Sequence, residues 1–185
     1  MVSELPAAGY GARRGEYGRR FVFISHIREE KGVDVLLEAA EALPPGYTVD
    51  LYGSIQDERY AASGYFEGKR ARYRGALKTE EVLPTLARYD VLVLPTHWKT
   101  EGYPGIIIEA MSLGIPTIST PIGGIPELIA DGQDGLIIKP HDARRCARPC
   151  SLSTQSATNG WLPPPSCGLT RPIILMWLMR RCGAT

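Results

Sequence analysis

The sequence predicts an α/β fold built on a doubly wound parallel sheet, and three observations predict it. Short β-rich apolar runs alternate with helical segments along most of the chain. Within those segments apolar residues recur at helical spacing, and Pro and Gly separate one segment from the next. One run is apolar throughout, which is typical of a strand buried on both faces. Strands alternating with helices at this spacing imply parallel pairing with right-handed crossovers.

The first elements follow a Gly-, Ala- and Arg-rich stretch over residues 1–18, which lacks periodicity and is interpreted as a linker arm. Residues 19–25 (RRFVFIS) form a short β-rich run and predict a strand. In residues 33–43 apolar side chains recur at helical spacing until the PPG triplet at Pro44 stops them. The chain therefore begins its ordered part as strand, loop and helix.

The next segments continue the alternation less clearly. Residues 47–53 predict a strand, residues 57–70 a weak helix that Gly64 and Gly68 interrupt, and residues 71–77 a brief strand. A second helix–strand unit follows in which Thr79 is the expected N-cap.

Three strands and three helices complete the expected domain. The helices have apolar residues at helical spacing and the strands are short apolar runs. The expected helices span 79–89, 104–114 and 125–132, and the expected strands span 90–96, 115–120 and 135–140. Residues 19–142 are therefore predicted to form one domain.

Composition excludes several function classes. The 185 residues carry a formal net charge of +1 and no block of basic residues, so a nucleic-acid partner is not expected. No run approaches the roughly 18 apolar residues of a membrane span, and the first 20 residues lack a signal core. We expect a cytoplasmic protein, with the inner face of the membrane as the alternative location.

The chain changes character after Asp142. Residues 143–185 contain no Asp, Glu or Lys, but they contain all four cysteines and six arginines. Three interpretations stay open: a zinc or disulfide module, although the cysteines lack metal-ligand spacing; a native tail that docks on a partner or a membrane; and a shifted reading frame. We favour the last and expect residues 143–185 to be an anomalous tail, frame-shifted or disordered, without function.

Function is expected in the strand-to-helix loops, because ligands of doubly wound sheets bind beyond the carboxyl ends of the strands. The helix that begins near Pro104 presents unpaired N–H groups, and Gly102 and Gly105 let backbone approach a ligand. Such a helix start favours a phosphate or diphosphate. The nearby carboxylates of Glu101 and Glu109 are suited to vicinal sugar hydroxyls. Alternatively, Glu101 is a solvated loop residue and Glu109 a surface charge.

The stretch EGYPGIIIEAMSLGIPTISTPIGGIPELIADGQDGLII resembles the donor-binding half of the family-four glycosyltransferases. Their signature is E-G-[FY]-[PG]-x4-E-A-M-[AS]-x-G-x-P-V-[IV], and this chain has every element but one small aliphatic residue, with the same glutamate spacing. EEKGVDVLLEAAEALP and YRGAL…LARYDVLVLPT resemble earlier parts of the same family, so the resemblance covers about residues 20–140. It implies a Rossmann-like domain, the C-terminal half of a two-domain GT-B enzyme whose acceptor-binding domain would precede Met1.

The resemblance implies retaining transfer of a glycosyl group from a nucleotide sugar to an acceptor hydroxyl, without metal or cofactor. Family members build polysaccharides, lipopolysaccharide and glycolipids, and peripheral membrane association of a full-length enzyme is compatible with this. An isolated donor domain is expected to be inactive. Two alternatives stay open: a non-catalytic nucleotide-sugar-binding or assembly module, and an epimerase, for which no acid–base set is found.

The resemblance also implies residue roles. Glu101 and Lys31 match the catalytic positions, and the loop of Gly102, Tyr103, Pro104 and Gly105 matches the one that supplies amides to the donor. Glu109 matches the glutamate that binds the ribose.

Other matches are weaker. His26 stands where the family has an arginine, and an imidazole can be neutral where a guanidinium cannot. Arg28 is expected to compensate if its loop folds toward the ligand. Gly75, Ala76 and Leu77 match the turn that borders the base. Less specific matches are the turn of Tyr52, Gly53 and Ser54, the Gly123-Gly124 turn, and Glu127, which we interpret as structural. His97 and Trp98 match no family role.

Overall fold

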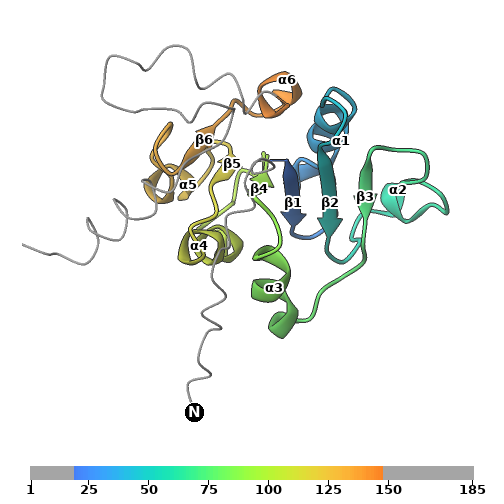
Figure 1. The fold of residues 1–185 in the computed structure, drawn as a ribbon, viewed down its shortest axis with the longest axis horizontal. Coiled ribbons are helices and arrows are strands. Elements are labelled where there is room, and N and C mark those ends of the chain that lie inside the picture. The colour runs from blue at the N-terminus through green and yellow to red at the C-terminus, as the bar shows by residue number, and fades with distance from the viewer. Residues whose placement is uncertain (1–18, 148–185) are drawn as a thin grey trace, which may run out of the picture.

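The computed structural model describes residues 19–147, and they form one sheet with helices on both of its faces (Figure 1). All pairings between neighbouring strands are parallel, and the strand order is β3-β2-β1-β4-β5-β6. The strands are β1 (Arg20–Ile24), β2 (Thr48–Tyr52), β3 (Ala71–Tyr73), β4 (Val91–Leu94), β5 (Thr117–Ser119) and β6 (Gly135–Ile137). The predicted doubly wound α/β fold is confirmed.

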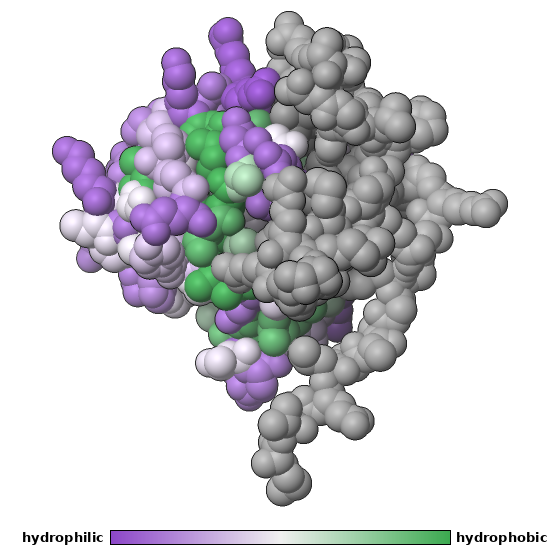
Figure 2. All heavy atoms as spheres, turned by 90° about the vertical axis from the view of Figure 1, so that its left-hand side faces the viewer, coloured by the Kyte–Doolittle hydropathy of each residue, from purple (hydrophilic) through white to green (hydrophobic). Residues whose placement is uncertain are grey.

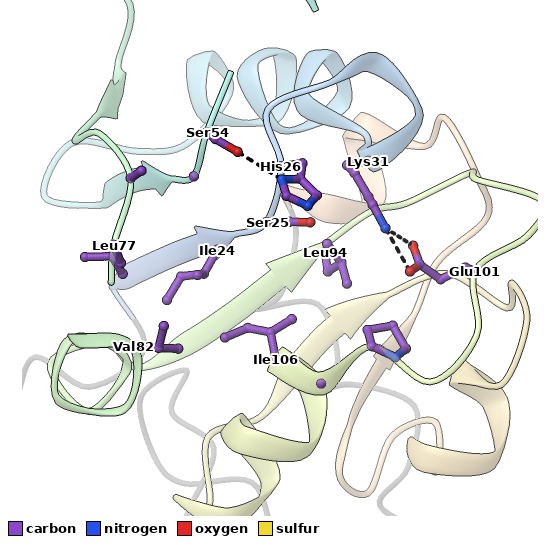
Figure 3. A pocket seen from close by; sticks show the side chains of 14 residues that line it. Ile24, Ser25, His26, Lys31, Ser54, Leu77, Val82, Leu94, Glu101 and Ile106 are labelled. Atoms are coloured by element: carbon purple, nitrogen blue, oxygen red, sulfur yellow. Dashed lines mark hydrogen bonds and ion pairs between the residues drawn. The ribbon is translucent and has the colours of Figure 1, made fainter. Parts of the chain in front are cut away.

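The helices follow the strands in alternation, as the sequence predicted. They are the 3-10 helix η1 (Glu29–Lys31) and the α-helices α1 (Val33–Glu41), α2 (Glu58–Ala61), α3 (Thr79–Leu86), α4 (Gly105–Ser112), α5 (Ile125–Leu128) and α6 (Ala143–Cys146). Helix α1 lies on one side of the sheet, where it contacts α6, and α3 and α4 lie on the other (Figures 1 and 3). Neither η1 nor α6 was predicted.

The burial and the length of the strands match their positions in the sheet. β4 is central and its four residues, Val91 to Leu94, are all buried, as its unbroken apolar run predicted. α1 buries six of its nine residues, because its apolar side chains recur every three or four positions. The two edge strands β3 and β6 have only three residues each, so little backbone is left without a partner strand.

Two local predictions were wrong. Thr79 is not an N-cap: helix α3 begins at Thr79, Lys78 is the N-cap, and the Glu81 carboxylate accepts a hydrogen bond of 2.8 Å from the Lys78 backbone N–H. The weak helix expected over 57–70 is reduced to α2, because Gly64 and Gly68 have φ angles of +79° and +71° that no helix contains.

The domain extends beyond residue 142, where we expected it to end. Helix α6 packs on α1 and buries Ala143 and Cys146. Its first turn is capped by Asp142, whose side chain accepts a hydrogen bond from the Arg145 N–H. Burial raises the pKa of the Cys146 thiol to about 12, so this cysteine is an unreactive packing residue. The expected linker arm and the rest of the expected tail lie outside the described residues.

A buried carboxylate fastens the β3 edge to the sheet. Asp50 of β2 is 5% exposed and accepts hydrogen bonds from Arg72 and Arg74, with Nε–O distances of 3.1 and 2.9 Å. The Tyr89 hydroxyl donates to the same carboxylate at 2.9 Å, and burial raises the pKa of that tyrosine. These contacts join β2, the β3 segment and the chain after α3.

Among the helices between residues 19 and 147, none combines the length and the apolar character of a membrane span.

Candidate functional site

A pocket of about 470 Å³ opens where the strand order reverses (Figure 3). The chain turns from β1 toward β2 and β3 on one side, and from β4 toward β5 and β6 on the other. Because crossovers leave in opposite directions from β1 and β4, a crevice remains between the loops that follow these two strands. Ile24 to His26 line it from β1, and Leu94 lines it from β4.

The pocket has a polar half and an apolar half (Figure 3). Polar side chains of the loops after β1, β2 and β4 gather at one end: Ser25, His26, Lys31, Ser54 and Glu101. Apolar side chains from the strand ends and from α3 and α4 gather at the other: Ile24, Leu77, Val82, Leu94 and Ile106. Such a cavity suits a ligand with one charged end and one flat or apolar end.

Lys31 and Glu101 form a buried ion pair on the polar side. The ammonium of Lys31 lies 2.8 and 2.7 Å from the two carboxylate oxygens of Glu101, and the side chains are 7% and 8% exposed. The Thr96 hydroxyl donates a third hydrogen bond to Glu101 at 2.8 Å. The two residues expected to be catalytic are therefore in direct contact, and each already has a charged partner.

Two glycines allow this contact. Gly32 has a φ angle of +79°, and a Cβ there would lie 2.1 Å from the carbonyl oxygen of Pro95. A Cβ on Gly123, with φ +56°, would lie 1.7 Å from the carbonyl oxygen of Glu101. Only residues without side chains let the loops after β1, β4 and β5 approach so closely.

His26 faces the same end of the pocket. Its Nδ1 atom is hydrogen-bonded to the Ser54 hydroxyl at 3.0 Å, which joins the loops after β1 and β2 (Figure 3). The imidazole is exposed, so its other nitrogen is accessible to a ligand. Lys31 and His26 thus supply the basic side chains of the pocket lining.

The loop before α4 forms another wall of the pocket. Pro104 is the N-cap of α4 and Gly105 its first residue, and both line the pocket. The unpaired N–H groups at this helix start favour an anion. Gly102 and Tyr103 belong to the same loop but do not line the pocket. The Tyr103 hydroxyl donates to Glu127 at 2.5 Å, which raises the pKa of the tyrosine and supports the structural interpretation of Glu127.

The three consecutive isoleucines of α4 point in three directions. Ile106 lines the pocket, Ile107 is fully buried in the core, and Ile108 is 48% exposed. Successive residues of a helix are rotated by about 100°, which explains the difference. Figure 2 shows hydrophobic residues in a band on the face of the molecule at the left of Figure 1, where α4, α5 and β6 lie.

Other predicted residues lie around the pocket. Ala76 and Leu77 line it, whereas Gly75 does not, and the Gly75 carbonyl accepts from the Gly53 N–H. Glu109 does not line the pocket: it is half-buried on α4, one turn beyond Ile106 on the same side of the helix, and burial raises its pKa. Its predicted role with ribose stays a prediction.

Arg28 does not line the pocket either. Its guanidinium is paired with Glu30 at 3.0 Å and lies over the ring of Trp98. The expected compensation for the missing arginine therefore has no support in this arrangement, because Arg28 is engaged elsewhere.

Sequence reasoning missed part of the lining. Ile24, Ser25 and Leu94 carry a signal that could have been used, since they stand at the carboxyl ends of two predicted strands. Val82 carries none, because its place depends on how α3 packs. Within residues 19–147 no group of three or more His, Cys, Asp or Glu side chains is arranged to hold a metal ion.

Comparison with known families identifies the class of protein. The family described as "Glycosyl transferases group 1" matches residues 18–151. The chain belongs to this family. Glycosyl transferases of group 1 have the GT-B fold, so the resemblance seen in the sequence is confirmed.

Individual proteins similar to this chain include a glycogen synthase and a glycosyltransferase. The chain is 30% identical over 143 residues to glycogen synthase of Mycobacterium tuberculosis, covering 72% of this chain and 33% of that protein. It is 30% identical over 139 residues to the amylovoran biosynthesis glycosyltransferase AmsK of Erwinia amylovora, covering 69% and 34%. This glycosyltransferase chain thus spans about a third of the length of these relatives.

Solved structures share the fold. Anabaena HepE in complex with UDP-glucose superposes with a TM-score of 0.62 at 22% identity, over 70% of this chain and 37% of that one. The C-terminal domain of the group 1 protein LpcC of Francisella tularensis gives 0.59 at 24% identity, over 71% and 73%.

Proposed function

We propose that this glycosyltransferase domain binds a nucleotide-sugar donor in the pocket between β1 and β4, for retaining transfer to an acceptor hydroxyl. The observation that carries the proposal is the polar half of the pocket: Lys31, His26 and the N-terminus of α4 converge on one place beside Glu101. These groups suit a diphosphate, and the apolar half beside Leu77 suits a base. HepE, a protein of the same fold, was crystallised with UDP-glucose.

The chemistry follows from the charges. In transfer, the bond between the anomeric carbon and a diphosphate oxygen breaks, and negative charge grows on the diphosphate. We propose that this charge is stabilised by Lys31, His26 and the N–H groups at the start of α4. Electrostatic stabilisation of charge in the transition state is usually the largest single contribution to the rate enhancement of an enzyme. We propose that Glu101 contacts the sugar, Glu109 the ribose hydroxyls, and Gly75, Ala76 and Leu77 the base.

Donor binding requires a change in the Lys31–Glu101 pair. Both groups are nearly buried and satisfy each other. A diphosphate that draws the ammonium toward itself leaves the carboxylate to accept hydroxyl hydrogens of the sugar. In the absence of substrate, each member of the pair therefore occupies the binding group of the other. When Lys31 exchanges Glu101 for the diphosphate, Glu101 becomes available to the sugar, so phosphate binding and sugar binding are coupled.

We further propose that transfer needs a second, acceptor-binding domain, that it needs no metal, and that it serves polysaccharide, lipopolysaccharide or glycolipid synthesis. AmsK, the relative from amylovoran biosynthesis, supports the setting. The alternative is a module that binds nucleotide sugars without transferring them.

Titration calorimetry with UDP, ADP, GDP and dTDP, and with their glucose forms, tests donor binding. At least one nucleotide is expected to bind the 185-residue chain, and the lack of heat with all of them would contradict the proposal. The Glu109→Ala variant is expected to bind about 1–3 kcal/mol more weakly, because the ribose hydroxyls lose an acceptor. Glu38→Ala, at an exposed position of α1, is the control.

Transfer separates the enzyme from the binding module. The chain joined to the acceptor domain of a relative is mixed with labelled donor and candidate acceptors, with and without EDTA. If the domain belongs to a retaining, metal-independent transferase, the joined protein forms product with the anomeric configuration of the donor sugar, both without and with EDTA. Binding without any product, at every acceptor tried, favours the module.

A further inference from the structure

Trp98 lies at the centre of a set of charges beside the pocket. It is half-buried in the loop between β4 and α4 and does not line the pocket. The Lys31 ammonium lies 4.2 Å from the centre of its ring, and the Arg28 guanidinium carbon lies 5.0 Å from it. Two cations on one indole ring are more than apolar packing requires, because the ring face carries the negative pole of its quadrupole.

Each of the two cations also has a carboxylate. Arg28 is paired with Glu30 at 3.0 Å and Lys31 with Glu101 at 2.7 Å. The charges thus alternate around the ring, with an acid at each end. In this arrangement the ring holds the Lys31 ammonium from one direction and Glu101 holds it from another.

The backbone around Trp98 fixes the carboxylate as well. The Trp98 carbonyl accepts from the Glu101 N–H at 2.9 Å, and the Trp98 N–H donates to the Thr96 hydroxyl at 3.2 Å. That hydroxyl, which is fully buried, donates to the Glu101 carboxylate at 2.8 Å. One tight turn therefore places both the ring and the carboxylate that contact Lys31.

We propose that Trp98 is a positioning residue for donor binding, whose ring keeps the Lys31 ammonium at the pocket when a diphosphate replaces Glu101 as its partner. An ammonium has three N–H donors, and Glu101 takes up two of them in this structure. The ring attracts the charge without accepting those hydrogens in the way an oxygen does. It can therefore hold Lys31 before and after the exchange. This inference rests on the proposed donor site.

Two substitutions separate a positioning ring from packing. Trp98→Phe keeps a ring face, and Trp98→Leu keeps an apolar side chain without one. We expect the affinity of the 185-residue chain for the nucleoside diphosphate it binds best, among UDP, ADP, GDP and dTDP, to fall by less than about twofold in the Phe variant. In the Leu variant it falls about three- to tenfold. Lys99→Ala, next in the chain and exposed, is the matched control and leaves affinity unchanged.

A double-mutant cycle identifies the partner. In a Lys31→Met background the change from Trp98 to Leu has no further effect on affinity if the ring acts through the ammonium. Equal affinity of the Phe and Leu variants, or an unchanged Leu effect in the Lys31→Met background, overturns the proposal. Absence of binding by the unsubstituted chain instead refutes the donor site itself, and this inference with it.

A measurement on the unsubstituted chain covers the case in which the Leu variant does not fold. The ring current of Trp98 shifts the Lys31 methylene protons next to the ammonium upfield in a proton–carbon NMR spectrum. The shift persists on saturation with the nucleoside diphosphate if the ring keeps its hold. Its loss on saturation contradicts the proposal.

Discussion

Two buried carboxylates of this protein, Glu101 and Asp50, show how similar contacts serve different ends. Glu101 accepts from Lys31 and from the Thr96 hydroxyl. Asp50 accepts from two arginines and from the Tyr89 hydroxyl. Each carboxylate thus accepts hydrogen bonds from cationic side chains, one for Glu101 and two for Asp50, and from one neutral hydroxyl.

Their places in the sheet differ. Asp50 stands in the middle of β2, and its arginines come from the neighbouring edge segment, so its contacts hold that edge. Glu101 follows the carboxyl end of β4 and faces the pocket, and its cation follows the end of β1. A buried ion pair does not indicate a ligand site by itself. Its position at the reversal of strand order does.

The largest expected effect is on the Glu101 side. Glu101→Leu leaves the Lys31 ammonium buried without its carboxylate and is expected to lower the free energy of unfolding by about 3–5 kcal/mol. Adding Lys31→Met removes the unpaired charge and is expected to restore most of that loss. Urea unfolding followed by circular dichroism measures both. Glu30→Ala, which removes the carboxylate of an exposed ion pair, is the control and is expected to change stability much less.

This comparison fails if the double variant is as unstable as the sum of the two single ones. In that case Lys31 and Glu101 would each contribute through other neighbours, and the exchange proposed for donor binding would lose its basis.

A smaller effect is expected at Asp50. Asp50→Asn keeps the shape but removes the charge from two arginine contacts and is expected to cost about 2 kcal/mol of unfolding free energy. Nucleoside diphosphate affinity, measured by calorimetry, is expected to stay within about twofold of the unsubstituted chain. A large loss of affinity would show that the edge and the pocket are coupled, contrary to the distinction drawn between them.

The smallest effect concerns pH. His97 lies in the Glu101 loop, where its N–H donates to the Glu30 carbonyl and its ring lies 4.2 Å from that of His141. Burial first, and His141 second, lower the pKa of His97. The folded state therefore binds this proton less readily than the unfolded chain, so the contribution to stability is complete above about pH 6.5 and decreases as the pH falls below it.

Urea midpoints measured between pH 7.5 and 5.5 check this dependence. His97→Gln is expected to lose part of the decrease on the acid side, while Glu38→Gln, at an exposed position, keeps it. A slope that is the same in all three proteins would mean that the half-buried His97 has the same pKa in the folded and unfolded states, contrary to this prediction.

Much of the fold could be predicted because its signals are local. Apolar runs and helical spacing located all six strands and most helices, and β4 was predicted as buried from its composition alone. α6 was missed because its short polar sequence becomes a helix only through the Asp142 cap and the packing of α6 on α1, which buries Ala143 and Cys146. Such contacts leave no periodic pattern.

The candidate site, too, has features that the sequence predicts and features that depend on tertiary contacts. The sequence by itself determined the chemistry that the loops offer: a lysine before a glycine, a glutamate before the Gly-Tyr-Pro-Gly stretch that leads into a helix, and glycines where loops meet. Only the tertiary structure decided which of these groups touch. Lys31 and Glu101 are 70 residues apart in the chain and pair because β1 and β4 are neighbours in the sheet, whereas Glu109, eight residues from Glu101, lies outside the pocket lining. Sequence spacing sets distance along a strand or helix, and strand order sets it across the sheet.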